Sequence, residues 1–204
     1  MDERVLKERF LKALPFITLG LELACVVVGT ILFLAYGLDH DDVFFKPPFE
    51  VCTIPYALAF PIYIGIELIG GLLSPEEGYT LCPLLTPNKK RTYISGIATV
   101  LGIVLGIVLF VLARADNPAL AGASLSWMST FGLVVYLGLS IVSTAKHGVK
   151  SRSFFAFIAY AFALIALTIC GFVLPSLGYT TFVMLFAGLG LICVIMTMLG
   201  RAED

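Results

Sequence analysis

The sequence predicts an all-α membrane protein, a polytopic bundle of six transmembrane helices with both chain ends on the same, inner face. Three observations predict this fold class. Of the 204 residues, 59% are hydrophobic and 13% are charged, whereas globular domains are about 25% charged. The mean hydropathy is +1.01. Long apolar runs alternate with short polar segments, so we expect a single membrane domain over residues 1–204 and no separate soluble domain.

The six predicted spans are apolar stretches long enough for a helix to cross the bilayer, which takes about 20 residues. We place them at residues 13–35, 52–73, 93–113, 119–143, 153–174 and 179–199. Pro175 and Gly178 divide the last long apolar run, and each half is long enough to span. The last two spans should therefore form a hairpin.

Basic residues set the orientation of the predicted bundle. The sequence has thirteen Lys and Arg residues. With the N-terminus inside, the six-span layout leaves only Lys46 and Arg114 outside. Adding or removing one span would destroy this asymmetry. We therefore expect both ends on the inner side.

The segment before the first span has an amphipathic pattern. Val5, Leu6, Phe10 and Leu14 recur at roughly helical spacing among basic residues, which predicts a short amphipathic helix at the inner interface. Pro15 lacks an N–H donor and its ring clashes with the preceding turn, so the chain should change direction there. The alternative is a continuous first helix with a charged beginning.

The outer loop after the first span carries Asp39, His40, Asp41 and Asp42. Carboxylates and an imidazole can ligate a divalent metal, but adjacent residues on one loop rarely converge on a single ion. We therefore expect a solvated acidic loop and no metal site.

The inner loop over residues 74–92 combines apolar and basic residues. Its leucines predict a loop that folds back on the membrane or on a partner. The basic run Lys89, Lys90 and Arg91 should anchor the third span to lipid phosphates.

Two acids inside spans are the strongest candidates for a functional site. Glu22 and Glu67 lie in apolar surroundings, where a charge costs at least about 2.5 kcal/mol on insertion scales. Counting from the inner ends of their helices puts both about 10 to 15 Å below the inner face, in one layer. The same counting places Thr99, Tyr136 and Tyr160 near this layer. Thr18 and Tyr63 lie one turn before Glu22 and Glu67, within side-chain reach.

Neither glutamate should have a counter-charge in its own bundle, because no predicted span contains Lys, Arg or His in its interior. Each carboxyl must then be protonated and hydrogen-bonded, share a proton with the other, hold a cation, or meet a basic group on another molecule. Three roles stay open: a fixed packing contact, proton or ion handling, and pairing with a partner subunit or lipid headgroup.

Small residues on the third predicted span point to close helix packing. Gly102 and Gly106 form a GxxxG pair, and Ala98 lies one turn earlier. This pattern allows two helix backbones to approach closely.

Catalysis is disfavoured by the residues present. The only histidines, His40 and His147, fall on opposite sides of the predicted membrane, so they cannot share a haem or a metal. No serine or cysteine has an evident base, and no glycine loop fits a phosphate. We expect no catalytic residue, no cofactor and no nucleic-acid partner.

The function that these patterns favour is that of a non-catalytic accessory subunit in a larger membrane complex, in contact with lipids and other membrane subunits. Analogy with accessory subunits of respiratory or other energy-converting complexes favours the mitochondrial inner membrane. The alternative is a small proton- or cation-coupled transporter or channel that uses Glu22 and Glu67.

Overall fold

The computed structural model describes residues 3–37, 48–75, 78–82, 85–113, 124–125, 127–147 and 179–198. Across these ranges every long element is a helix: α1 (Glu3–Leu32), α2 (Pro48–Leu73), α3 (Lys89–Ala113), α5 (Trp127–His147) and α7 (Tyr179–Met198). A π-helical turn, η1 (Phe33–Gly37), extends α1. The predicted all-α class is confirmed for the described part of the chain.

Three of the helices are long and apolar enough to cross a membrane. The qualifying segments are Arg4–Ala35, Thr53–Leu73 and Lys89–Ala113. Shorter apolar helical segments occur at Trp127–Ser143 and Ala187–Met198. The prediction of several apolar helices typical of a membrane protein is confirmed. The predicted span at 153–174 and the acidic outer loop lie outside the described residues.

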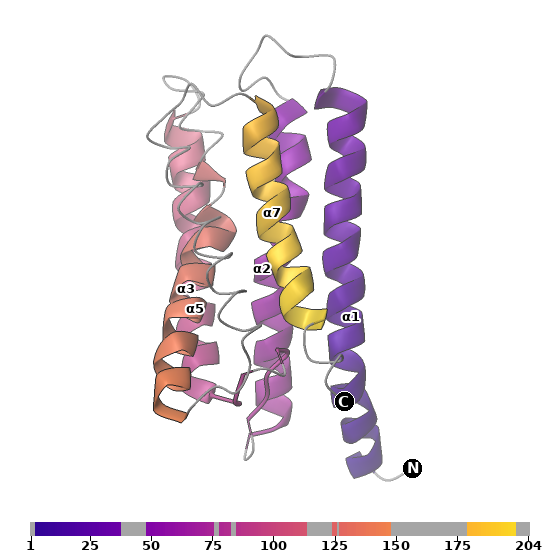
Figure 1. The fold of residues 1–204 in the computed structure, drawn as a ribbon, viewed down its shortest axis with the longest axis vertical. Helices are drawn as coiled ribbons and strands as arrows, with labels where there is room; N and C mark the ends of the chain where they lie inside the picture. The colour runs from indigo at the N-terminus through magenta and orange to yellow at the C-terminus, as the bar shows by residue number, and fades with distance from the viewer. Residues whose placement is uncertain are drawn as a thin grey trace.

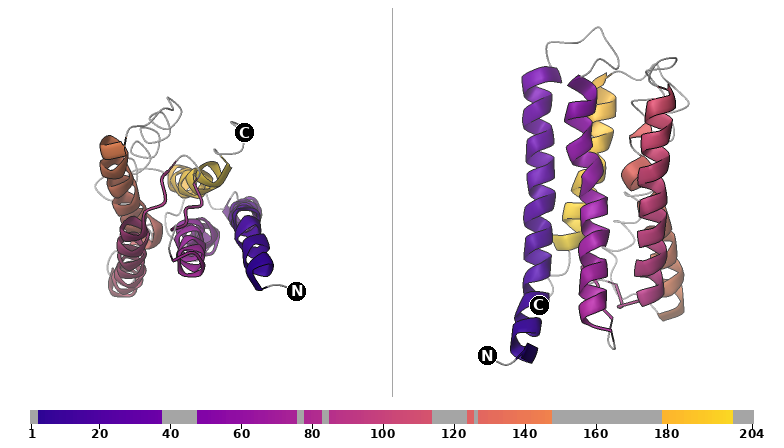
Figure 2. Two further views of the ribbon diagram at one scale, coloured as in Figure 1. Left: turned by 90° about the horizontal axis from the view of Figure 1, so that it is seen from below. Right: turned by 180° about the vertical axis from the view of Figure 1, so that it is seen from behind.

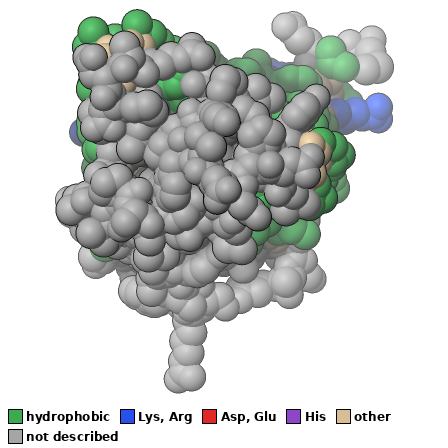
Figure 3. Space-filling model, turned by 90° about the horizontal axis from the view of Figure 1, so that it is seen from above, with side chains coloured by type: hydrophobic (Ala, Val, Ile, Leu, Met, Phe, Trp, Pro, Cys, Tyr) green, Lys and Arg blue, Asp and Glu red, His purple; other side chains and the backbone are tan. Residues whose placement is uncertain are grey.

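The helices stand side by side as a bundle, with α2 at its centre (Figures 1 and 2). Helix α2 contacts α1, α3, α5 and α7. Helices α1 and α3 run in one direction, whereas α2, α5 and α7 run in the other (Figure 1). Viewed from the end where α1 finishes, the coloured side chains around the rim are predominantly hydrophobic (Figure 3).

Glycines bring α3 and α5 into close contact. A Cβ atom on Gly102 would lie 2.5 Å from the carbonyl oxygen of Trp127, and one on Gly106 would lie 3.0 Å from that of Ser124. Ala98 is buried on the same side of α3. The small residues singled out in the sequence therefore lie where α3 meets α5.

Helix α1 corrects one prediction. The separate amphipathic helix expected before Pro15 is wrong, because α1 continues unbroken from Glu3 through Pro15; the alternative of a continuous first helix is what the structure has. Proline cannot donate to the carbonyl four residues earlier, which belongs to Leu11. The hydroxyl of Tyr79, from the loop after α2, donates to this carbonyl oxygen at 3.3 Å. A side chain distant in sequence thus supplies the donor that Pro15 lacks.

The core sits between α2, α5, α7 and the loop after α2. Loop residues Leu81, Cys82 and Leu85 are buried in one cluster with Tyr63 and Leu137. The loop therefore folds back on the chain's own bundle and brings polar backbone groups close to Glu67.

Candidate functional site

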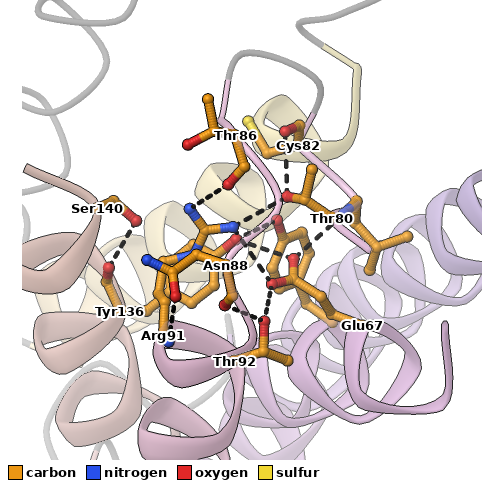
Figure 4. Close-up of polar contacts among 11 residues, drawn as sticks. Glu67, Thr80, Cys82, Thr86, Asn88, Arg91, Thr92, Tyr136 and Ser140 are labelled. Carbon is orange, nitrogen blue, oxygen red and sulfur yellow. Dashed lines mark hydrogen bonds and ion pairs between the residues drawn. The ribbon is translucent and has the colours of Figure 1, made fainter. Parts of the chain in front are cut away.

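Glu67 lies in the last two turns of α2 and is completely buried. Its Oε1 atom accepts a hydrogen bond from Thr92 Oγ1 at 2.8 Å and lies 3.7 Å from Arg91 Nη2. Its Oε2 atom accepts bonds from Tyr136 Oη at 2.9 Å and from the backbone N–H of Leu81 at 3.2 Å. These groups converge on the carboxyl from α3, α5 and the loop (Figure 4). A carboxylate that faces only donors and a cation is satisfied in its ionised form.

Arg91 is 1% exposed, although it was expected to reach lipid phosphates. Its guanidinium donates to the carbonyl oxygen of Thr86 at 3.3 Å and to Thr80 Oγ1 at 3.2 Å, and its Cζ atom lies 5.0 Å from the ring centroid of Tyr136. Two predictions are therefore wrong: Arg91 is not a headgroup anchor, and Glu67 does have a counter-charge. The start of α3 provides it from just outside the predicted span.

The helical register of α3 explains why Arg91 turns inward. The side chain of Asn88 caps the helix by accepting from the N–H of Arg91 at 3.2 Å. From there Arg91, Ser95 and Thr99 follow at intervals of one turn, and all are buried. The two lysines that precede Arg91 are exposed. The small residues on one face of α3 recur about once per turn, and this spacing, extended back to the first turn, reaches Arg91. The sequence therefore contains a signal that the side chain of Arg91 points inward.

Two tyrosines extend the network away from the carboxylate. The hydroxyl groups of Tyr63 and Tyr136 are 3.1 Å apart, and their rings meet edge to face with centroids 5.6 Å apart. Both side chains are fully buried. The structure thus brings three predicted residues of the polar layer together, namely Glu67, Tyr63 and Tyr136. Thr99 instead donates to the carbonyl oxygen of Ser95 at 2.7 Å, and Tyr160 lies outside the described residues.

Glu22 occupies a different environment, between α1 and α7. It is completely buried, and Thr197 Oγ1 lies 2.9 Å from its Oε2 atom. The same hydroxyl oxygen lies 2.9 Å from the carbonyl oxygen of Cys193. Within the described part of the chain, Oε1 of Glu22 has no hydrogen-bond partner.

The surroundings of Glu22 favour its protonated form. Thr197 is the hydrogen-bond donor to its Oε2 atom, and no donor among the described residues reaches Oε1. A charged carboxylate that is buried with so few donors is costly. The two buried acids therefore differ in charge state. The surroundings of Glu67 favour a carboxylate, and those of Glu22 favour a neutral carboxyl group.

Glu67 also affects the pKa of Tyr79, the loop residue that donates to the carbonyl oxygen of Leu11. Burial, and then the negative charge of Glu67, raise the pKa of Tyr79 to about 12. A phenol is neutral at physiological pH in any case, and the raised pKa of Tyr79 extends to more alkaline pH the range in which its hydroxyl donates to the carbonyl oxygen of Leu11.

The described residues contain no group of three or more His, Cys, Asp or Glu side chains placed to hold a metal ion. Within the same ranges the two acids have different partners, Thr197 for Glu22 and the α3–α5 cluster for Glu67. No protein-family model matches the chain, and no curated protein or solved structure matches it.

Proposed function

We propose that the chain is a non-catalytic subunit of a larger membrane assembly. The observation that carries the proposal is the enclosure of Glu67. An ion pair with Arg91 and three hydrogen bonds to Thr92, Tyr136 and Leu81 occupy the carboxyl group. A transport or catalytic group needs access to a solute, whereas this group joins two other helices and a loop to α2. Its role is to hold the bundle in one arrangement.

The outward faces of the bundle support a role in assembly. Only 17% of the residues in the most apolar stretch of α1 are buried, and 33% of those in α3. In the central α2 the share of buried residues is 44%. Both outer helices present large apolar side chains: Val27, Val28 and Ile31 on α1, and Ile97, Val100, Leu101 and Val104 on α3. Such faces suit lipid tails or the helices of neighbouring subunits.

We further propose the six-span topology with both ends inside. Helix α5 finishes at the end of the bundle where α1 begins, and α7 starts at the opposite end (Figure 1). Residues 148–178 connect those two ends, and they include the apolar stretch 153–174. The distribution of Lys and Arg supports the same count. Membership of an energy-converting complex in the mitochondrial inner membrane is proposed by analogy only.

Purification in a gentle detergent, followed by mass determination of the intact complex, tests the subunit role. We expect the full-length chain to copurify with other membrane proteins at fixed stoichiometry. A monomer or homo-oligomer that carries no other protein from its native membrane would overturn the proposal.

Proton or cation handling is a second candidate, and the geometry ties it to Glu22 alone. Glu22 is as completely buried as Glu67, but its Oε1 atom has no hydrogen-bond partner among the described residues. It therefore keeps an acceptor position that a proton or cation can occupy when the site opens. The test is proton flux in proteoliposomes, with Glu22→Gln compared to Glu8→Gln, an exposed acid on the same helix. Flux that is lost only in Glu22→Gln would support transport, and no flux in any variant would exclude it.

A further inference from the structure

A hollow of about 600 Å³ lies where the first turns of α1 meet the last residue of α2. Among the described residues, its apolar lining comprises Leu6 and Phe10 from α1 and Leu73 from α2, and its basic lining comprises Lys7 and Arg9. Leu6 and Phe10 are 55% and 44% exposed, so both are accessible to an occupant of the hollow. The hollow therefore combines an apolar floor with positive charge.

The order of residues on α1 places the charges on both sides of the apolar stripe. Leu6 and Phe10 are one turn apart and share a face, because a turn contains about 3.6 residues. Lys7 and Arg9 then fall on opposite flanks of that stripe, and Glu8 falls on the far side of the helix. On this part of α1, two cations therefore border the apolar stripe with no acid between them.

The hollow lies at the level of the membrane surface. Helix α1 begins and α2 ends at the same end of the bundle (Figure 2). Helix α3 also begins at this end, and its first two residues, Lys89 and Lys90, are exposed. Basic residues at the ends of apolar helices mark the headgroup layer. An occupant would thus meet apolar side chains and cations at the depth where a phospholipid changes from acyl chain to headgroup.

We propose that this hollow binds an anionic phospholipid. The phosphate lies between Lys7 and Arg9, and the first part of an acyl chain packs on Leu6, Phe10 and Leu73. The two cations neutralise the headgroup, while the apolar floor distinguishes a lipid from a free phosphate ion. The site requires a membrane location but does not depend on the proposed subunit role.

Native mass spectrometry of the full-length chain in detergent tests the site, with dioleoyl phosphatidylglycerol, dioleoyl phosphatidylcholine and inorganic phosphate as probes. The double variant Lys7→Gln/Arg9→Gln should bind phosphatidylglycerol about twenty-five-fold more weakly than the wild type, since each basic residue near the surface contributes about fivefold. The matched control is Lys89→Gln/Lys90→Gln, which removes the same charge from exposed positions on α3. This control should retain wild-type affinity.

A third variant examines the apolar floor. Leu73→Trp fills the hollow without changing its charge and should weaken phosphatidylglycerol binding at least tenfold. If Lys7→Gln/Arg9→Gln and Lys89→Gln/Lys90→Gln lost the same amount of phosphatidylglycerol affinity, then general attraction to a positive surface would explain the binding, and the proposal would be overturned. Equal binding of phosphatidylcholine, or binding of inorganic phosphate as tight as that of the lipid, would also overturn it.

Discussion

Replacing Arg91 by Met should destabilise the bundle more than any other removal of a single basic residue in the described chain. The substitution keeps a long apolar stem but deletes the cation that faces Glu67. Breaking a buried ion pair by removing one partner costs about 3–5 kcal/mol. Three hydrogen-bond donors to Glu67 survive, so we expect the lower end, about 3 kcal/mol.

The loss is measurable as a fall in the midpoint of thermal unfolding in detergent. For a chain of this size 1 kcal/mol corresponds to about 2–4 °C, so the midpoint should fall by about 10 °C. Heating followed by size-exclusion chromatography with fluorescence detection gives the midpoint. Lys90→Met is the matched control, because it removes the same charge from the preceding, exposed position. It should shift the midpoint by less than about 2 °C.

A double variant separates the ion pair from simple loss of packing. Glu67→Gln removes the negative charge that Arg91→Met leaves unpaired, so the double variant should be more stable than Arg91→Met alone. The expected coupling is about 1–3 kcal/mol. Equal midpoints for Arg91→Met and Lys90→Met would refute the inferred role of Arg91, as would strict additivity in the double variant.

Other variants examine the remaining contacts. Tyr79→Phe removes the donor to the carbonyl freed by Pro15 and should cost about 1 kcal/mol in thermal unfolding; the cost should shrink in a Pro15→Ala background, where the helix supplies its own N–H. Because the folded pKa of Tyr79 is raised from 10.0 to about 12, its stabilising effect should be complete below pH 10 and lost as pH rises through 12; a pH series comparing wild type with Tyr79→Phe checks this sign. Gly102→Ala places a Cβ atom 2.5 Å from the backbone oxygen of Trp127 and should cost about 1–3 kcal/mol. Gly138→Ala, with nothing within 4 Å, should instead be neutral or stabilise the helix by up to about 1 kcal/mol. Infrared spectra should contain a protonated-carboxyl band that disappears in Glu22→Gln but persists in Glu67→Gln, and a band lost only in Glu67→Gln would reverse our assignment.

The helical bundle could be predicted because apolar runs of span length leave the backbone few alternatives in lipid. Glu22 and Glu67 also stand out in sequence, since buried acids are rare in apolar helices. Their environments could not be predicted from composition. Arg91 belongs to a basic run that normally indicates a headgroup anchor, and only the register of α3 distinguishes it from the lysines beside it.

The remaining features depend on contacts between residues distant in sequence. The N–H of Leu81 reaches Glu67 only because the loop after α2 folds inward. Pro15 would end an isolated helix by the local rule, but Tyr79 compensates for the missing donor. Tertiary contacts of this kind override local preference, and single-sequence patterns carry little information about them.

The bond between Tyr79 and Leu11 has a consequence for the order in which the protein is made. While α1 leaves the ribosome, the carbonyl of Leu11 has no N–H donor in its own helix, because Pro15 occupies the donor position. Its donor arrives only when the loop after α2 has been synthesised, so this backbone group is satisfied only after α1 and the segment that follows α2 have come together.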